Sequence, residues 1–120
     1  MVSDRSELFG GKLGQVLPAT TTAQTLFTAL ATTEITRIQI CNLTNNNVQY
    51  FLYHNDTAAT YATENVLVYN KTINGYSVDV IEAASQGSGI TVQKNGSLGV
   101  SASAGSHLNF TAYGIVQKVR

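Results

Sequence analysis

The sequence predicts an all-β fold: a single antiparallel β-sandwich or jelly roll of about seven or eight strands with an N-terminal extended arm. No segment carries apolar residues at helical spacing for long enough to indicate a helix. β-Branched residues and tyrosines, which favour strands, are spread along the chain. Short apolar runs alternate with Asn- and Gly-containing turns, and 120 residues suffice for one compact domain.

The clearest strand is predicted at residues 35–43, after an earlier strand at 24–29. Ile38 and Ile40 alternate with polar residues, which places them on the inner face. Three consecutive asparagines at 45–47 predict the turn that ends this strand.

The next strand, at 48–53, is apolar on both faces and should be covered on both sides. Its two faces consist of Val48, Tyr50 and Leu52, and of Phe51 and Tyr53. The polar stretch at 54–64 then predicts a loop.

Two further strands are predicted at 66–73 and 76–81, separated by the turn dipeptide Asn74-Gly75. The second of them ends at a glycine-rich stretch, 86–89. Its expected inner positions are Tyr76, Val78 and Val80.

A hairpin is predicted from Ile90 to Ala102, with Asn95-Gly96 in its turn. A last strand begins near Leu108 and runs past Gly114 toward Val116. The alternation predicts a core of Ile38, Ile40, Val48, Tyr50, Leu52, Val78, Val80, Leu98, Val100, Leu108 and Phe110.

The segment before Pro18, the only proline, reads differently from the rest. Its apolar residues lie among glycines without helical or strand periodicity, so we expect an arm at 1–17 and a β-sandwich domain at 18–120. We expect the arm to be mobile in the free protein and to dock on a partner through Leu8, Phe9, Leu13, Val16 and Leu17.

The composition disfavours several classes of function. Seven basic and seven acidic side chains cancel, so no long-range field attracts nucleic acid, and neither nucleic acid nor a membrane is expected as a partner. Only 12% of residues are charged, a low value that suits a protein largely covered by neighbours. The N-terminus lacks the apolar run of a signal peptide or membrane span. Cys41 is alone and is expected to be a small buried strand residue.

The sequence shows no recognisable set of catalytic residues, and neither a metal nor another cofactor is expected. His54 and His107 are the only histidines, too few for a histidine-rich metal site. Gly87-Ser88-Gly89 resembles a flexible turn more than a nucleophile elbow. Asp79 and Glu82 should point to opposite faces as solvated residues.

Exposed aromatic rings leave carbohydrate binding as an alternative, since such rings stack on sugars in many β modules. The rings that the alternation leaves outside the core are Tyr53, Tyr61, Tyr69 and Tyr113.

Several segments together resemble a family of small β-sandwich virion proteins of tailed bacteriophages. These segments are 14–20 (G-Q-V-L-P-A-T) with 26–28 (L-F-T), 37–42 (R-I-Q-I-C-N), 67–73 (L-V-Y-N-K-T-I), and 97–103 (S-L-G-V-S-A-S) followed by 109–114 (N-F-T-A-Y-G). The sequence departs from the family in having Gly99 where a charged residue is common, and in a long loop at 81–89.

The resemblance implies a non-enzymatic head-decoration or cement protein that binds and stabilises the head shell, or a neck or tail-fibre adaptor. The expected partners are further copies of the chain, with a trimer favoured, and the major capsid protein or neck and tail proteins. The expected location is the virion, assembled in the host cytoplasm. A carbohydrate-binding β module remains the alternative from a different class.

Overall fold

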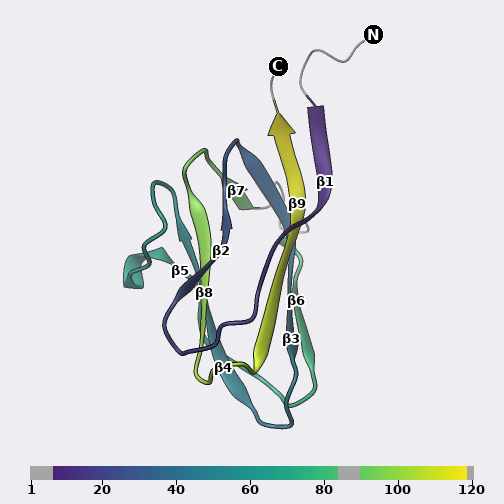
Figure 1. Ribbon diagram of the computed structural model, residues 1–120, viewed down its shortest axis with the longest axis vertical. Coiled ribbons are helices and arrows are strands. Elements are labelled where there is room, and N and C mark those ends of the chain that lie inside the picture. The colour runs from purple at the N-terminus through teal and green to yellow at the C-terminus, as the bar shows by residue number, and fades with distance from the viewer. Residues whose placement is uncertain (1–6, 84–89, 119–120) are drawn as a thin grey trace.

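The computed structural model describes the backbone of residues 7–83 and 90–118, and the side chains of 11–83 and 90–116. Within these ranges the regular secondary structure is almost entirely strand (Figure 1). The strands are β1 (Glu7–Val16), β2 (Gln24–Thr28), β3 (Thr33–Asn42), β4 (Val48–Asn55), β5 (Val66–Ile73), β6 (Val78–Ile81), β7 (Ile90–Val92), β8 (Ser97–Ala102) and β9 (Leu108–Lys118). A 3-10 turn, η1 (Thr63–Asn65), precedes β5. In the part of the chain described, no helix has the length and hydropathy needed to cross a bilayer.

The strands form two antiparallel sheets that pack face to face, which confirms the predicted all-β sandwich. One sheet has the order β1-β9-β3-β6, with β7 also paired to β3. The other has the order β2-β8-β4-β5.

β6 and β7 occupy one row of the first sheet. β6 pairs with residues 38–41 of β3, and β7 pairs with residues 33–35 of the same strand. Both lie on the edge of β3 that β9 leaves free, since β9 pairs along the whole of β3. They are therefore two parts of one interrupted edge strand.

With β6 and β7 counted as one strand, the pairing is that of a jelly roll. β1 pairs with β9, β2 with β8, β3 with β6 and β7, and β4 with β5. This is the pattern of one long hairpin rolled up so that its successive strand pairs alternate between the two sheets. The jelly-roll alternative of the sequence prediction is thus the one observed.

The loops between the sheets are joined by the buried side chain of Asn42, at the end of β3. Its amide nitrogen donates to the backbone oxygens of Asn46 at 2.7 Å, Asn74 at 3.1 Å and Ile73 at 3.3 Å. Its oxygen accepts hydrogen bonds from the backbone nitrogen and hydroxyl of Thr44, both at 3.0 Å. One amide therefore fixes the β3–β4 and β5–β6 connections against each other.

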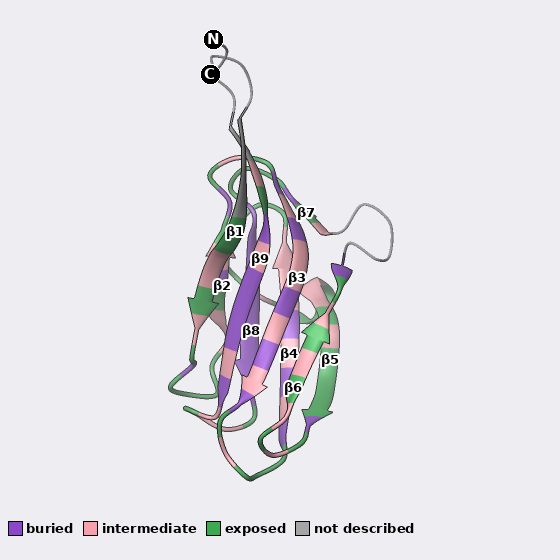
Figure 2. Ribbon diagram, turned by 90° about the vertical axis from the view of Figure 1, so that its right-hand side faces the viewer, coloured by how far each residue is buried: buried purple, intermediate pink, exposed green. Residues whose placement is uncertain are grey.

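Burial follows the layers of the sandwich. Figure 2 shows buried residues concentrated along β9, β8 and β3, while β5 and β6 at the sheet edges carry more exposed positions. β8 is buried along its whole length. The protein is therefore best covered at the centre of each sheet and least covered at the edge formed by β5 and β6.

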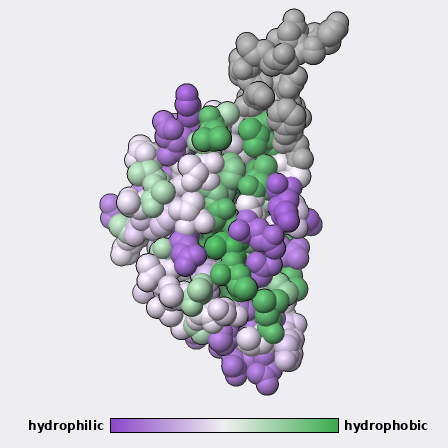
Figure 3. All heavy atoms as spheres, viewed as in Figure 1, coloured by the Kyte–Doolittle hydropathy of each residue, from purple (hydrophilic) through white to green (hydrophobic). Residues whose placement is uncertain are grey.

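At the opposite edge, between β1 and β2, the sandwich is not fully closed. A groove of about 420 Å³ is lined by Leu13, Thr25, Leu26, Phe27, Thr28, Leu30, Thr33 and Val116. Figure 3 shows a band of apolar side chains along this face, with polar side chains on both sides. Leu30 is largely exposed at the rim.

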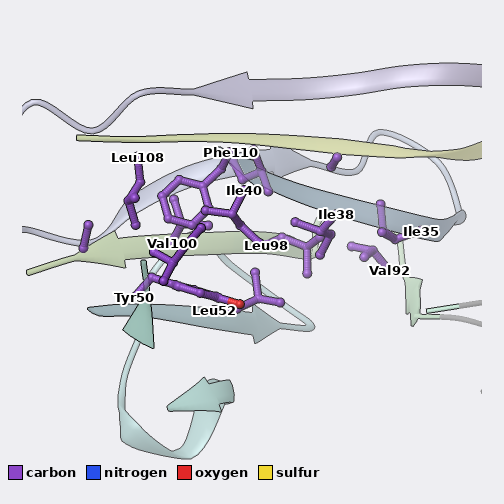
Figure 4. Close-up of a cluster of buried hydrophobic side chains, with 14 of the residues drawn as sticks. Ile35, Ile38, Ile40, Tyr50, Leu52, Val92, Leu98, Val100, Leu108 and Phe110 are labelled. Carbon is purple, nitrogen blue, oxygen red and sulfur yellow. The ribbon is translucent and has the colours of Figure 1, made fainter. Parts of the chain in front are cut away.

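The core between the sheets contains most of the predicted residues (Figure 4). Ile38, Ile40, Val48, Tyr50, Leu52, Leu98, Val100, Leu108 and Phe110 are all buried, as the alternation predicts. Tyr50 from β4 and Phe110 from β9 meet edge to face with ring centroids 6.0 Å apart, which joins the two sheets. The same core also includes residues that the alternation did not single out, among them Ile35, Ile73 and Val92.

The predicted facing of β6 is wrong. Val78 and Val80 are about half exposed and Tyr76 is 74% exposed, whereas Ile81 packs against the core. Because Asp79 accepts a hydrogen bond from the hydroxyl of Tyr50, the odd-numbered residues of this strand face inward. The apolar residues on both faces of β6 made the alternation ambiguous.

The predicted hairpin at Ile90–Ala102 is also wrong, although its turn is present. The nitrogen of Gly96 donates to the oxygen of Gln93 at 2.8 Å, and Asn95 has a φ of 75°. However, β7 pairs with β3 and β8 pairs with β2 and β4, so this turn passes the chain from one sheet to the other. The turn is held by Ala29, which exchanges backbone hydrogen bonds with Asn95 and Gly96.

The stretch expected to lack strand structure is a strand over most of its length. β1 pairs with β9 from Glu7↔Lys118 to Val16↔Phe110, with an irregularity between Lys12 and Gly14. The pairing with β9 supplies the order that the glycines deny the isolated segment.

Cys41, expected to be buried, is partly exposed, because the inward positions of this part of β3 are Ile38, Ile40 and Asn42.

Candidate functional site

The histidines and acidic side chains of the described residues form no metal-binding cluster. Among them no group of three or more His, Cys, Asp or Glu side chains could hold a metal ion. His54 Nε2 lies 3.1 Å from the carboxylate of Asp56, and His107 Nδ1 lies 2.6 Å from the backbone oxygen of Gly105. Gly87-Ser88-Gly89 lies outside the described residues.

Asp79 has two side-chain partners in the part of the chain that the structure describes. Its carboxylate accepts a hydrogen bond from Tyr50 Oη at 3.0 Å and pairs with Lys71 Nζ at 3.3 Å. It is therefore a link between the sheets, not the solvated residue that the sequence predicts, while Glu82 is exposed. Burial raises the pKa of the Tyr50 hydroxyl well above its usual value, and the hydrogen bond to Asp79 and the charge of that carboxylate raise it further.

The predicted partner-binding residues of the N-terminal segment are dispersed by the structure. Leu13 and Val16 are partly buried and pack against the core of their own chain. Leu17 is 44% exposed. The side chains of Leu8 and Phe9 lie outside the described ones, so docking through these residues stays a prediction.

Aromatic rings gather instead on the outer face of the second sheet, where β4, β5 and the loop between them meet. Phe51 and Tyr69 stand edge to face at 5.2 Å and 89°, and Tyr53 and Tyr61 lie 5.6 Å apart. A pocket of about 220 Å³, here called the aromatic pocket, is lined by Phe51, Tyr53, Tyr61, Ala62, Thr63, Val66 and Tyr69. This pocket is the candidate binding site.

Gly99 of β8 makes room for one wall of the aromatic pocket. A Cβ atom at Gly99 would lie 2.5 Å from ring atoms of Tyr61, so the ring lies directly on the strand backbone. The Tyr61 hydroxyl contacts Ser97 Oγ at 2.8 Å and Thr25 Oγ1 at 3.0 Å, and it donates to the oxygen of Leu98 at 3.3 Å. The residue that departs from the family pattern therefore has a local role.

The loop that carries Tyr61 is held at both ends. The Asn55 side chain donates to the oxygen of Thr60 at 2.6 Å and accepts from the backbone nitrogens of Thr57 and Ala58. Ser97 Oγ donates to the oxygen of Ala58 at 2.6 Å. These bonds fix the loop against the sheet and position the aromatic wall.

A second surface, here called the β6 patch, consists of the exposed apolar residues Leu43, Tyr76, Val78 and Val80. They lie on adjacent chain segments, because Val78 pairs with Cys41 and the nitrogen of Tyr76 donates to the oxygen of Thr44. Lone exposed apolar residues are common, but a cluster on one strand edge is typical of a contact surface.

Sequence reasoning found part of these surfaces. It placed Tyr53, Tyr61 and Tyr69 outside the core, and all three line the aromatic pocket. Tyr113 lies elsewhere, on β9, under the guanidinium of Arg37 at 4.6 Å. Sequence reasoning missed the packing of Tyr61 on Gly99. The available signal was a glycine within a buried strand.

No protein-family model matches the chain, and no curated protein is similar to it. Among solved structures, a chain of the T13 IBDV viral particle is similar, with a TM-score of 0.52 and 11% identity over 96% of this chain and 31% of that chain. The Gx strain of infectious bursal disease virus gives a TM-score of 0.44 and 14% identity, over 96% of this chain and 32% of that chain. The coat protein of tobacco streak virus gives 0.44 and 8%, over 98% of this chain and 89% of that chain.

The first of these similarities concerns the fold. The chain spans about a third of the length of the IBDV protein that it matches. At 11% identity the match shows a shared β-sandwich architecture and transfers no residue role.

Proposed function

We propose that this chain is a non-enzymatic structural protein of a virion. The observation that carries the proposal is the jelly-roll pairing of the whole described chain, an arrangement that recurs in viral capsid proteins. The similarity in fold to a chain of the T13 IBDV viral particle supports it. Jelly rolls also serve other functions, so the surface features must agree with this role.

Within the virion, we favour a decoration or cement protein that binds the head shell of a tailed bacteriophage. The low fraction of charged residues supports this role, because a surface covered by neighbours needs few charges for solubility. The sequence resemblance to tailed-phage virion proteins supports the phage assignment. A neck or tail-fibre adaptor is the runner-up, since the same family includes such modules.

Self-association is part of the proposal, with a trimer as the favoured assembly. The β6 patch offers a surface for it, because Val78 and Val80 are each about half exposed beside Leu43 and Tyr76. Burying such side chains in a subunit contact stabilises it by about 25 cal/mol for each Å² of apolar surface removed from water. A closed ring of subunits would bury this patch on every copy.

Particle binding tests the proposal. Purified phage heads lacking the protein are incubated with the wild-type chain or with the double variant Val78→Lys/Val80→Lys, and retention after sedimentation is measured. We expect the wild type to bind heads saturably and to raise their melting temperature. The double variant should bind poorly because unpaired lysines at the β6 patch prevent the subunit contact that holds the head-bound assembly together.

The matched control is Thr21→Lys/Thr22→Lys, which adds the same charge at exposed positions between β1 and β2. It should bind heads like the wild type. Failure of the wild-type chain to bind or stabilise heads would rule out the decoration role.

A further inference from the structure

Folding contacts account for the Tyr61 wall of the aromatic pocket but not for the exposed ring of Tyr69. Tyr69 is 70% exposed, although it stands beside the ring of Phe51 at the mouth of the pocket. Among the described residues its hydroxyl has no hydrogen-bond partner. A large exposed ring with a free hydroxyl at the rim of a concave site indicates a ligand contact.

We propose that the aromatic pocket binds one pyranose ring of a neutral saccharide, a property beyond the proposed structural role. The C–H face of a pyranose carries weak positive charge and stacks on the negative face of an aromatic ring. Phe51 and Tyr69 meet at 89°, which gives the pocket two aromatic surfaces at a right angle. The rim hydroxyls of Tyr69 and Thr63 can bond to the sugar hydroxyls.

The size of the pocket selects a small ligand. Its volume of about 220 Å³ is below the several hundred Å³ typical of sites for drug-sized molecules. A single sugar ring fits this scale, whereas the rest of a longer glycan would extend into solvent. The aromatic pocket should therefore recognise one sugar unit of a glycan, either at its end or within its chain.

The charge of the pocket selects a neutral ligand. All seven lining residues are uncharged. A phosphate, a sialic acid or a nucleic-acid backbone would require Lys or Arg side chains nearby to compensate for the loss of hydration. Neutral hexoses and N-acetylhexosamines meet the site without such a requirement.

The wall formed by Tyr61 is fixed before any ligand arrives. The Tyr61 hydroxyl is tied to Ser97, Thr25 and Leu98, and its ring lies on Gly99. Because these groups are already ordered, binding does not incur the entropic cost of ordering the loop. This preorganisation separates the aromatic pocket from a chance cluster of exposed rings.

Nuclear magnetic resonance of the isolated chain tests the inference. Methyl pyranosides of glucose, galactose, mannose, N-acetylglucosamine and N-acetylgalactosamine are each titrated into the 15N-labelled protein. We expect at least one to shift the amide signals of Phe51, Tyr53, Tyr61 and Tyr69 saturably, with a dissociation constant in the millimolar range or tighter. Glucuronic acid and inorganic phosphate should leave these signals unchanged.

Two variants identify the site. Tyr69→Ala should weaken binding at least about tenfold while the remaining amide spectrum stays native. Leu30→Ala removes a similarly exposed large apolar side chain outside the aromatic pocket and should bind like the wild type. Gly99→Ala, which displaces the Tyr61 ring, should also weaken binding without abolishing the fold.

The proposal is wrong if none of the five methyl pyranosides shifts these signals. It is also wrong if Tyr69→Ala and Leu30→Ala bind a sugar equally well. Loss of head binding by Tyr69→Ala, with no sugar binding by the wild type, would identify the pocket as a protein contact. Since the titrations use the isolated chain, their outcome is independent of whether the chain binds heads.

Discussion

At the scale of single residues, the side chain of Asn42 holds several backbone groups together by hydrogen bonds. A hydrophobic side chain cannot do this. The Asn42 amide satisfies carbonyls from two connections between the sheets and also organises the turn at Thr44. The residue is 1% exposed, so water cannot replace these bonds without local opening. A polar residue at the end of an otherwise apolar strand thus determines how both connections pack.

Replacing Asn42 by Ala should lower the free energy of unfolding by about 3 kcal/mol, since several buried carbonyls lose their donor. Asn42→Asp should be at least as damaging, because it places a carboxylate against backbone oxygens. Asn45→Ala, at an exposed position in the same turn, should change stability by less than about 0.5 kcal/mol. Urea denaturation measures all three, and equal effects of Asn42→Ala and Asn45→Ala would contradict the role of Asn42.

Phe110 provides the corresponding test of the apolar core. Its side chain is completely buried and meets Tyr50 across the sheets. Phe110→Ala should therefore destabilise the protein by about 3–5 kcal/mol. Gln39→Ala, on the outer face of β3, should cost little. Similar losses for both variants in thermal denaturation would show that the inner and outer faces are assigned incorrectly.

Tyr50 adds a dependence on pH. Its pKa is raised in the folded protein, first by burial and then by Asp79, so the unfolded chain loses this proton at lower pH than the folded one. The stabilisation from the neutral hydroxyl is complete below the unfolded pKa of about 10 and is lost as the pH rises toward the higher folded pKa. Tyr50→Phe should therefore lose less stability than the wild type between neutral and strongly alkaline pH. Identical alkaline slopes for the two proteins in urea titrations would contradict this assignment.

At the scale of elements, the pairing of β1 with β9 determines whether the N-terminal segment is part of the sandwich or a detachable arm. The residues paired with β9 include Val16, whose side chain packs against the core, and Gln15, whose side chain is exposed. Val16→Asp should lower stability by about 2–3 kcal/mol because it places a carboxylate against apolar side chains. Gln15→Asp, the neighbour on the opposite face, should be nearly neutral. If both variants melt like the wild type, β1 is a detachable arm.

The elements also show which features the sequence could predict. Residues 66–73 were predicted as a strand and form β5, because an apolar run ended by Asn-Gly gives both the strand and its end. The Asn95-Gly96 turn was predicted, but not which strands it joins. Turn residues determine the local backbone conformation, whereas the choice between a hairpin and a crossing between sheets depends on Ala29, more than sixty residues away in the chain.

The candidate sites were less predictable for a similar reason. Alternation placed Tyr53 and Tyr69 outside the core, and their rings do line the aromatic pocket. Their meeting with Tyr61 depends on a loop folded back over Gly99, which no local pattern encodes. On β6, the alternation assigns Val78 and Val80 to the core. The contact of Asp79 with Tyr50, which places these valines on the outer face, cannot be inferred from the sequence.

At the scale of the whole molecule, the features agree on a jelly roll with a closed centre and two distinctive surfaces. The first and last strands of the chain, β1 and β9, pair with each other, and the two middle strands, β4 and β5, pair at the other end of the rolled hairpin. The β6 patch belongs to the sheet that contains β3 and β9, and the aromatic pocket belongs to the sheet that contains β4 and β5. This separation is compatible with a protein that attaches to a particle and presents a saccharide site outward.

The most direct test of the structural role is the copy number of the protein in purified particles, measured by quantitative mass spectrometry against the major capsid protein. Decoration of the shell predicts a ratio that is a fixed simple fraction of the major capsid protein, as the symmetry of the shell requires. A protein present in only a few copies per particle would belong to the neck or tail. Absence of the protein from purified particles would contradict the virion role itself.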